Sequence, residues 1–190
     1  MLRIGLFLLM ATTAMAQEKA TVGIGTNGGM GTGTVVARDG KLAYILTNKH
    51  VISSSDKRIW VIHDRKRYEA KFVKADPNVD LALAVLELDI EPVQLADREP
   101  KEGEFVKHFG RATGPQEGKM TGWTNFATSD GVVMDSDIFS VAGDSGSGMF
   151  NADGKLVAVH YGRKGDPDGD TVALGVRLTR IREFLKGVGK

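Results

Sequence analysis

The sequence predicts an all-β protein made of two β-barrels of similar size, and three observations lead to this prediction. Short apolar runs rich in β-branched residues recur along most of the chain. Turn-forming residues separate these runs, and the chain contains 24 glycines. A polar segment, "ADREPKEGE" over 96–104, divides the runs into two groups and is the candidate linker. Short strands with turn signals between them are typical of barrels and sandwiches, so a single sandwich remains the alternative.

We expect the first barrel over 17–97 and the second over 98–190. In the first, "GTVVA" and "LAYILTN" flank Asp39-Gly40, a pair typical of a tight hairpin turn. The remaining strands of that barrel are expected at "RIWVIHD", "YEAKFVKAD" and "LALAVLEL". The strands of the second are expected at "FVKHFGR", "KMTGWTNF", "VVMDSDIF", "GSGMF", "KLVAVHYG" and "TVALGVRL".

The last segment, "LTRIREFLKG", predicts a short amphipathic helix. Its apolar residues Ile181, Phe184 and Leu185 recur at helical spacing. Thr179 is the expected N-terminal cap, and Gly187 is expected to end the helix. The second barrel is therefore expected to carry this terminal helix.

The N-terminus, "MLRIGLFLLMATTAMA" over 1–16, has the layout of a secretory signal peptide. An early arginine precedes an apolar run, and small residues follow up to the expected cleavage site after Ala16. The run is shorter than the roughly 20 apolar residues that span a bilayer, which argues against the alternative of a retained anchor. We therefore expect a periplasmic or extracellular protein that starts at Gln17 and makes no membrane contact after the signal is removed.

The composition argues against several classes of function. Lys and Arg number 25 and Asp and Glu number 24, without a basic stripe, so nucleic acid is not an expected partner. The chain has no cysteine, which excludes disulfides, cysteine nucleophiles and thiolate metal sites. The stability of the fold must therefore come from packing.

Ser145 is the strongest candidate nucleophile. In "SVAGDSGSGMF" it is surrounded by Gly143, Asp144 and Gly146. Glycine allows backbone conformations that are closed to other residues, and it lets a substrate backbone approach. The amides of Gly143 and Ser145 are expected to point at one spot beside the hydroxyl and to form an oxyanion hole. We interpret Asp144 as structural, with its carboxylate holding the turn.

A serine hydroxyl needs a base, which is usually histidine. The chain has four histidines. His50 lies in "ILTNKHVI", where an apolar strand ends and the chain turns, and a strand end holds a base rigidly while leaving it accessible. We interpret His63 and His108 as structural or surface histidines.

The base needs a carboxylate to orient it, and "DPNVDLALAVLEL" offers Asp76 and Asp80. Asp76 precedes a proline and suits a turn. Asp80 enters the protein as the chain becomes apolar, where an unpaired charge is costly, and the imidazole of His50 would pair with it. A catalytic triad of His50, Asp80 and Ser145 is therefore expected, with Asp80 as a simple strand cap as the alternative.

The segments that carry these residues resemble the three signature segments of trypsin-like (chymotrypsin-fold) serine proteases. They are "LTNKHVI", "DPNVDLALAVLEL" and "GDSGSGMFNADGKLVAVHYG". These motifs are most similar to those of the cysteine-free bacterial branch of the family, which contains high-temperature-requirement proteases and glutamyl endopeptidases. The resemblance implies two six-stranded antiparallel barrels with the active site between them. It also implies cleavage of proteins or peptides through an acyl-enzyme, without a metal or organic cofactor. No further peptide-binding domain is expected after the helix.

The same resemblance predicts where a substrate lies. The peptide backbone is expected to pair with "AVHYG" over 158–162, where Tyr161 and Gly162 would line the edge. Glycine at this edge leaves room for the incoming chain. We therefore expect Tyr161 and Gly162 to contact the substrate.

Two further positions bear on specificity. Ser140 and His160 occupy the offsets from Ser145 at which glutamyl endopeptidases carry a hydroxyl residue and a histidine that hold the substrate carboxylate. This predicts cleavage after acidic residues, especially glutamate. Phe139 occupies the offset of the aspartate that selects basic residues in trypsin-like enzymes, so cleavage after Lys or Arg is not expected. The alternative is that His160 is an ordinary strand histidine and that small apolar residues are preferred.

Other functions are weaker readings. An inactive protease-like binding protein is the main alternative, although such proteins usually lose a member of the triad. An α/β-hydrolase would need Gly two residues after the nucleophile, where this chain has Ser147, and its acid and histidine would follow in that order. Only Asp153 and His160 follow in that order, and Asp153 lies in a hairpin turn, "NADGK".

One acidic segment has a spacing of aspartates that is similar to that of a cation-binding loop. "GDPDGD" places Asp166, Asp168 and Asp170 at alternate positions, as in a calcium loop. The glutamate that completes an EF-hand loop is absent, so we expect an acidic surface turn and no metal site.

Overall fold

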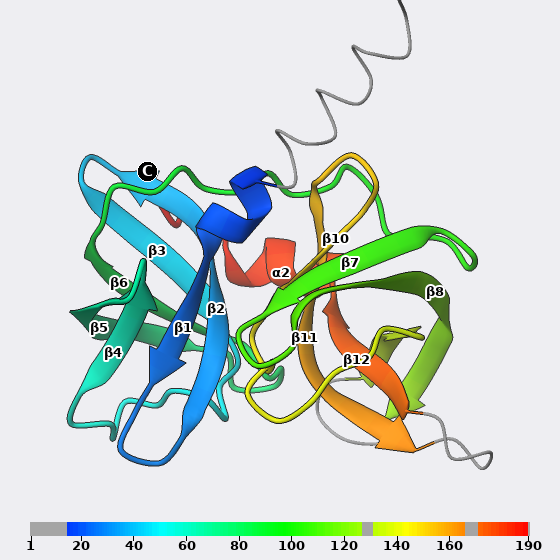
Figure 1. Ribbon diagram of the computed structural model, residues 1–190, viewed down its shortest axis with the longest axis horizontal. Helices are drawn as coiled ribbons and strands as arrows, with labels where there is room; N and C mark the ends of the chain where they lie inside the picture. The colour runs from blue at the N-terminus through cyan, green and yellow to red at the C-terminus, as the bar shows by residue number, and fades with distance from the viewer. Residues whose placement is uncertain (1–14, 127–130, 166–170, 190) are drawn as a thin grey trace, which may run out of the picture.

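Two closed six-stranded barrels lie side by side in the computed structural model, which describes residues 15–126, 131–165 and 171–189 (Figure 1). All the strand pairs are antiparallel. The predicted fold class is therefore confirmed, and the sandwich alternative is wrong.

The first barrel is formed by the N-terminal half of the chain. Its strands are β1 (Thr21–Gly25), β2 (Met30–Asp39), β3 (Leu42–Thr47), β4 (Ile59–His63), β5 (Lys66–Ala75) and β6 (Ala82–Glu87). They are hydrogen-bonded in the order β1-β2-β3-β6-β5-β4, and β1 pairs with β4 to close the barrel. The predicted hairpin turn joins β2 to β3, with Gly40 at a φ of 56°.

The second barrel repeats this strand order. Its strands are β7 (Phe105–Gly110), β8 (Gly114–Phe126), β9 (Gly131–Ser136), β10 (Gly148–Phe150), β11 (Leu156–Gly165) and β12 (Thr171–Arg177). They run β7-β8-β9-β12-β11-β10, and β10 pairs with β7 to close the barrel. The boundary expected between 97 and 98 lies in the connection from β6 to β7 and stays a prediction.

One strand of the first barrel was not predicted. β1 has the sequence "TVGIG", in which two glycines dilute the apolar pattern that marks a strand. Its residues are nevertheless almost all buried, and they pair with both β2 and β4. Each of the other strands overlaps a segment at which a strand was expected.

The C-terminal helix is present, but its predicted ends are wrong. α2 (Leu178–Phe184) follows Arg177, which makes no side-chain cap. The carboxylate of Glu99 instead accepts hydrogen bonds from the backbone N–H of Thr179 (2.9 Å) and from its hydroxyl (2.5 Å). Thr179 therefore does not cap the helix. The carboxylate of Glu99, in the connection between the barrels, takes this role, since a negative charge is favourable at a helix N-terminus. The helix ends at Phe184, before Gly187 is reached.

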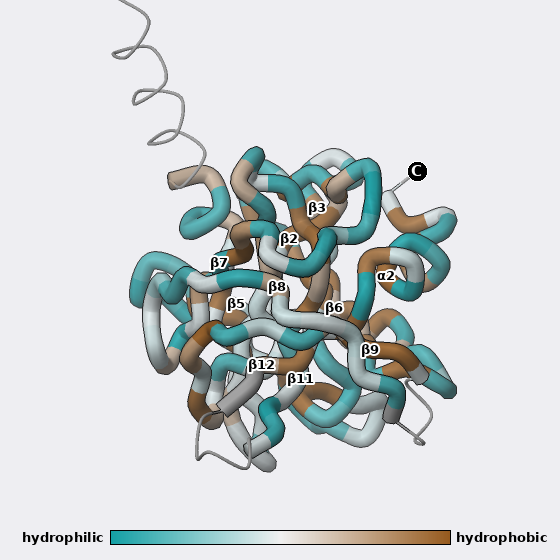
Figure 2. Tube along the Cα trace, turned by 90° about the vertical axis from the view of Figure 1, so that its right-hand side faces the viewer, coloured by the Kyte–Doolittle hydropathy of each residue, from teal (hydrophilic) through white to brown (hydrophobic). Residues whose placement is uncertain are grey.

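Three apolar clusters hold the molecule together. One fills the first barrel around Val22, Ile45 and Ala84, and another fills the second around Met120, Met134 and Val157. The third lies between the barrels and joins β3 and β6 to the inner face of α2. Figure 2 shows that brown, hydrophobic residues lie on several strands and on one side of α2, and that teal, hydrophilic residues lie in many of the connecting segments. The two barrels are therefore packed directly onto each other.

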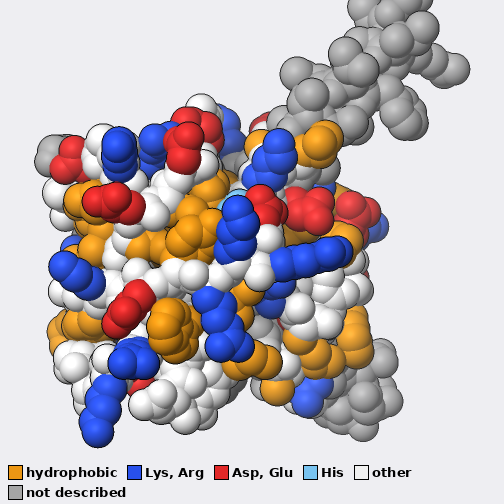
Figure 3. Space-filling model, turned by 60° about the vertical axis from the view of Figure 1, so that its left-hand side comes forward, with side chains coloured by type: hydrophobic (Ala, Val, Ile, Leu, Met, Phe, Trp, Pro, Cys, Tyr) orange, Lys and Arg blue, Asp and Glu red, His pale blue; other side chains and the backbone are white. Residues whose placement is uncertain are grey.

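The surface carries mixed charge. Figure 3 shows Lys and Arg side chains interspersed with Asp and Glu over one face of the molecule. This agrees with the balanced composition of the sequence.

Two of the predictions fall wholly or largely on residues outside the described ranges. The expected signal segment over 1–16 lies largely outside the described residues. The description begins at residue 15, and residues 15–20 are helical. No helix among the described residues is long and apolar enough to cross a membrane. The acidic turn with Asp166, Asp168 and Asp170 also lies outside the described residues.

Candidate active site

His50 and Asp80 meet because their strands are paired. β3 ends at Thr47 and β6 begins at Ala82, and these two residues are directly opposite in the sheet. The residue after β3 and the residues before β6 therefore emerge at the same edge of the first barrel. There the Asn48 side chain donates a hydrogen bond to the Asp80 carbonyl (2.8 Å), which fixes the two segments relative to each other.

Asp80 holds His50 at two points. Oδ2 of Asp80 accepts a hydrogen bond from Nδ1 of the imidazole (2.6 Å), and Oδ1 accepts one from the backbone N–H of His50 (3.0 Å). Because the carboxylate is an acceptor, Nδ1 carries the proton and Nε2 of the neutral ring is left as a base. The Asp80 hydrogen bond raises the pKa of His50 above 6.5, against an opposing effect of burial.

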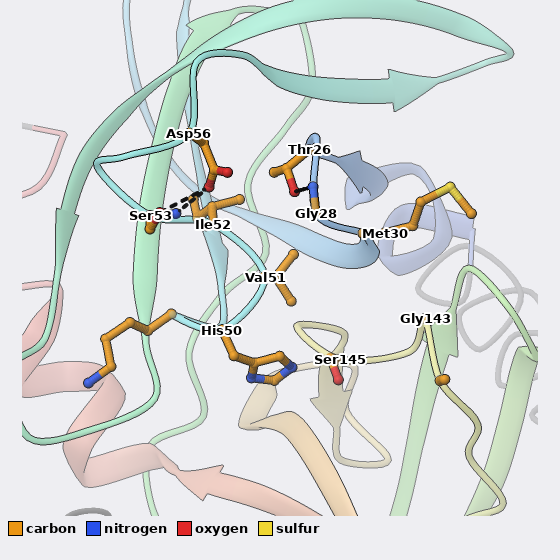
Figure 4. Close-up of a pocket in the computed structure, with 13 residues that line it drawn as sticks. Thr26, Gly28, Met30, His50, Val51, Ile52, Ser53, Asp56, Gly143 and Ser145 are labelled. Atoms are coloured by element: carbon orange, nitrogen blue, oxygen red, sulfur yellow. Dashed lines mark hydrogen bonds between the residues drawn. The ribbon is translucent and has the colours of Figure 1, made fainter.

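Ser145 comes from the second barrel, in the loop between β9 and β10. Thr32 of β2 connects this loop to the first barrel. Its backbone N–H donates to the Ser145 carbonyl (2.7 Å), and its hydroxyl donates to the Gly143 carbonyl (2.8 Å). Figure 4 shows the Ser145 hydroxyl beside the imidazole of His50. The structure thus brings His50, Asp80 and Ser145 to one place at the junction of the barrels.

The backbone amides next to this hydroxyl are available. Among the described residues, neither the N–H of Gly143 nor that of Ser145 donates a hydrogen bond to the protein. Gly143 has a φ of 104°, a conformation that favours glycine. Two unengaged amides beside a hydroxyl are suited to receive a negatively charged oxygen.

Asp144 anchors the loop from the inside. It is fully buried, and its carboxylate accepts hydrogen bonds from the backbone N–H groups of Ala112 (3.1 Å), Thr113 (3.2 Å) and Val141 (3.0 Å). The carboxylate lies so close to Gly110 that a Cβ there would collide with it. Asp144 therefore ties the Ser145 loop to the turn between β7 and β8.

Ser140 and His160 are both buried, with 1% and 2% of their surfaces exposed. His160 stacks edge-on against His108, with 5.6 Å between the ring centroids, and its Nδ1 donates to the Leu174 carbonyl (3.2 Å). Burial lowers the pKa of His160 to about 4, so its ring is neutral at pH 7. Phe139, by contrast, is 56% exposed.

His108 is not a surface histidine. It is fully buried, and Nδ1 of its ring lies 3.1 Å from the Ser147 hydroxyl. Burial lowers the pKa of His108 as well. This burial could not be predicted from the sequence, because it depends on pairing with Met149 of β10, which is distant in the chain. His63 sits at the end of β4 with its Nε2 3.3 Å from the Asp64 carboxylate, in keeping with a structural role.

β11 borders the loop on one side. The Gly146 N–H donates to the His160 carbonyl (2.8 Å), which sets this strand against the residue after Ser145. The pairing of β11 with β12 shifts register between His160 and Gly162, so Tyr161 is the extra residue of a bulge. A Cβ built on Gly162 would meet nothing within 4 Å, so the edge there is open.

Two residues near the site were missed by sequence reasoning. Thr32 looks like any polar strand residue until the second barrel packs on it. Arg163 follows the substrate-edge segment directly, and its guanidinium donates to the Ser140 carbonyl (3.2 Å). The one signal in the sequence was a basic residue directly after 158–162, whereas its contact with Ser140 appears only in the structure.

No group of three or more histidine and acidic side chains able to hold a metal ion occurs within 15–126, 131–165 and 171–189. The expectation of no metal site stays a prediction, since the acidic turn over 166–170 lies outside these ranges.

Comparison with known proteins gives a consistent result. Residues 31–159 match the trypsin-like peptidase domain. A protein of Marinomonas sp. (strain MWYL1) named "Probable periplasmic serine endoprotease DegP-like" is 32% identical in sequence over 87% of this chain. The chain spans 37% of the length of that relative.

Solved structures agree on the fold. The Rv3671c protease of M. tuberculosis, in its inactive form, superimposes with a TM-score of 0.79 at 22% identity, covering 96% of both chains. The HtrA-type protease AlgW with a tripeptide gives a TM-score of 0.80 at 18% identity, covering 94% of this chain and 63% of that one. The resemblance stated from the sequence motifs is confirmed.

Proposed function

The chain belongs to the trypsin-like peptidase family, and from this premise we propose that it is a serine endopeptidase that uses His50, Asp80 and Ser145 as its catalytic triad. One observation carries the proposal. Asp80 holds the His50 ring by its Nδ1 at 2.6 Å, with the Ser145 hydroxyl beside the ring. A nucleophile, a base and an orienting carboxylate in this arrangement are suited to acyl transfer.

The proposed reaction has two stages. Oγ of Ser145 attacks the scissile carbonyl carbon while Nε2 of His50 takes the hydroxyl proton. The carbonyl oxygen becomes an oxyanion and accepts hydrogen bonds from the amides of Gly143 and Ser145. His50 then gives its proton to the leaving nitrogen, the C–N bond breaks, and an acyl-enzyme remains. Water, activated by the same base, hydrolyses this ester and restores Ser145.

A fluorophosphonate probe tests the proposal. We expect the purified protein to be labelled at Ser145, and we expect Ser145→Ala to lose both labelling and hydrolysis of peptides while it keeps its fold. Absence of labelling in the folded wild-type protein would contradict the proposal and favour a protease-like binding protein instead.

We further propose a preference for acidic residues on the amino side of the cut. Ser140 and His160 would hold the carboxylate, with Tyr161 and Gly162 along the backbone of the substrate. The support is the burial of both side chains and the position of Arg163, which adds a positive charge 3.2 Å from the Ser140 carbonyl. Hydrogen bonds to an ion are about twice as strong as neutral ones.

We propose that the protein is exported and acts on proteins or peptides in the periplasm or outside the cell. The expected signal segment over 1–16 and the similarity to a probable periplasmic endoprotease support this. N-terminal sequencing of the protein from fractionated cells tests it, and a chain that keeps its first 16 residues in the cytoplasm would contradict it. We also propose that the boundary between the two barrel domains lies between residues 97 and 98, in the connection from β6 to β7.

A further inference from the structure

A second pair of a serine and a histidine lies inside the second barrel, behind the nucleophile. Ser147 and His108 are both fully buried, and Oγ of Ser147 lies 3.1 Å from Nδ1 of His108. Ser147 is the second residue after Ser145, in the loop between β9 and β10, whereas His108 lies on β7. The pair therefore connects the loop of the nucleophile to a strand of the barrel.

This buried pair is not a second reaction centre. Neither of its side chains has exposed surface, so no substrate reaches the Ser147 hydroxyl. Any effect of the pair on a reaction at Ser145 must therefore pass through the loop that the pair holds.

Ser145 lies in a four-residue turn that ends at Ser147. The backbone N–H of Ser147 donates to the Asp144 carbonyl (3.0 Å), so Ser145 and Gly146 are the two central residues of the turn. Gly146 has a φ of 90°, a conformation that favours glycine. The position of the Ser145 hydroxyl and N–H therefore depends on where the two ends of the turn, Asp144 and Ser147, are held.

Both ends of this turn are held by one segment of the chain, residues 108–113. At the first end, the Asp144 carboxylate accepts a hydrogen bond from the backbone N–H of Thr113 (3.2 Å), among others. At the second end, the Ser147 hydroxyl contacts His108. Oγ1 of Thr113 also lies 3.5 Å from Nε2 of His108, so the two anchor points are neighbours. A single support thus sets both ends of the turn that carries the nucleophile.

The hydroxyl and the imidazole are well matched in this interior. Burial lowers the pKa of His108, so its ring is neutral near pH 7 and has one donor and one acceptor nitrogen. A hydroxyl can pair with either nitrogen, so the bond forms in both tautomers. A buried hydroxyl or ring nitrogen without a partner is costly. The end of the turn at Ser147 is therefore held against β7.

We propose that His108 is a positioning residue for acyl transfer, which acts through Ser147 to fix the turn that presents the Ser145 hydroxyl and the oxyanion amides. The inference rests on the proposed endopeptidase function and deepens it. It assigns a role in the reaction to a histidine that no substrate touches.

The rate of labelling by the fluorophosphonate probe measures this effect. The probe needs the Ser145 hydroxyl and the oxyanion amides in place, but it does not need the peptide edge on β11. We expect Ser147→Ala and His108→Phe each to slow labelling about tenfold, as a small displacement of the reacting groups does. The double variant should be no slower than either single variant, because both changes remove the same bond.

Two further variants separate positioning from stability. Ser136 is another fully buried serine of this barrel, but its hydroxyl donates to a carbonyl of β12, that of Ala173 (3.5 Å). Ser136→Ala should lower the Tm as Ser147→Ala does and leave the labelling rate unchanged. His108→Asn keeps a polar atom near the place of Nδ1, so it should be labelled faster than His108→Phe, although its smaller side chain leaves a cavity and lowers the Tm. A purely structural role would rank the labelling rates by Tm.

Steady-state hydrolysis of a peptide gives a second measurement. In Ser147→Ala, kcat should fall with the labelling rate while KM stays within about twofold of the wild type, because only the reacting groups are displaced. The expected substrate edge at Gly162 is set by the pairing of β11 with β12, which the substitution does not touch. A raised KM with an unchanged kcat would contradict a positioning role.

Two outcomes would overturn the inference and leave the proposed function standing. One is labelling of Ser147→Ala at the rate of Ser136→Ala, a comparison that does not require His108→Phe to fold. The other is slowing in the double variant that equals the product of the slowing in the two single variants.

An NMR experiment separates the inference from the proposed function. If the folded wild-type protein were not labelled, the proposed function would fail, but the backbone amide signals of Gly143 and Ser145 would still report on the turn. These signals should shift in Ser147→Ala and stay in place in Ser136→Ala. Signals that Ser147→Ala leaves unmoved would overturn the role of the buried pair.

Discussion

Asp80 binds His50 through both of its carboxylate oxygens, one on the imidazole and one on the backbone N–H. The ring is thus fixed in tautomer and in position by a single side chain. The second contact also means that Asp80 orders the chain around His50, besides acting on the ring itself.

The first prediction follows from this double contact. Asp80→Asn should lower kcat/KM about 10³- to 10⁴-fold, because an amide that donates to Nδ1 imposes the wrong tautomer. The measurement is steady-state hydrolysis of a peptide, with circular dichroism as the check on folding. A variant within tenfold of the wild type would show that Asp80 is a strand cap and not part of the triad.

The second prediction concerns pH. The Asp80 hydrogen bond raises the pKa of His50 above 6.5, so the ring keeps a proton at a higher pH than a free histidine does. A protonated ring cannot serve as base, and kcat/KM should therefore fall as the pH drops through a midpoint above 6.5. A pH–rate profile from 5 to 9 checks this. A midpoint near 5 would point to a base other than His50.

The third prediction tests the anchor of the Ser145 loop. Gly110→Ala would force the Asp144 carboxylate away from the amides of Ala112 and Thr113, because its Cβ would occupy the same space. We expect labelling by the fluorophosphonate probe to slow about 10- to 100-fold, as the oxyanion donors lose their alignment. Gly25→Ala is the control, since a Cβ at Gly25 would only make an ordinary contact with Trp60. Equal labelling rates for the two variants would mean that the loop does not depend on Asp144.

The fourth prediction concerns stability. Glu99 accepts hydrogen bonds from Thr179 at the N-terminus of α2, and it forms an ion pair with Arg177 (3.1 Å). Glu99→Ala should lower the free energy of unfolding by about 1–2 kcal/mol, as loss of a helix cap does. Urea denaturation checks it, with the exposed Glu102→Ala on the same connection as the control. Equal midpoints for the two variants would show that Glu99 contributes nothing to the docking of α2.

The residues proposed for catalysis could be found from the sequence because few residues of the right chemistry exist. The chain has only four histidines, and the local patterns around Ser145 and Asp80 are distinctive. Together they left one candidate nucleophile, one candidate base and one candidate carboxylate. The strand ends that hold His50 and Asp80 were visible as the places where apolar runs stop or start. The identity of the nearest contacts, such as Thr32 on the Ser145 loop, could not be inferred, because they arise only when the two barrels pack.

The errors have a common physical cause. Thr179 was expected to cap α2 on local grounds, but a carboxylate distant in sequence provides the acceptor. The sequence left His108 open as a structural or a surface histidine, because its burial depends on pairing with β10. β1 escaped notice because its glycines carry no side chain to mark the pattern, while its backbone still completes the barrel. Local sequence signals do not report contacts made by distant segments.

The last prediction tests the acidic preference through its dependence on pH. Nδ1 of His160 donates to the Leu174 carbonyl, so in the neutral ring Nε2 has no proton. A hydrogen bond from His160 to a substrate carboxylate must come from Nε2 and therefore requires a second proton on the ring. Burial lowers the pKa of His160 to about 4, so this proton is absent near neutral pH until a bound carboxylate favours it.

Binding of glutamate should accordingly be linked to uptake of one proton. The ratio of kcat/KM for a Glu substrate to that for its Gln analogue should rise by up to about tenfold for each unit that the pH falls between 8 and 6. Loss of the base function of His50 affects both substrates and cancels in the ratio. His160→Ala should flatten the dependence, whereas Arg163→Gln should lower the ratio equally at every pH. A peptide-library profile that favours Val, Ala or Leu before the cut, unchanged in His160→Ala, would show that His160 is an ordinary strand histidine.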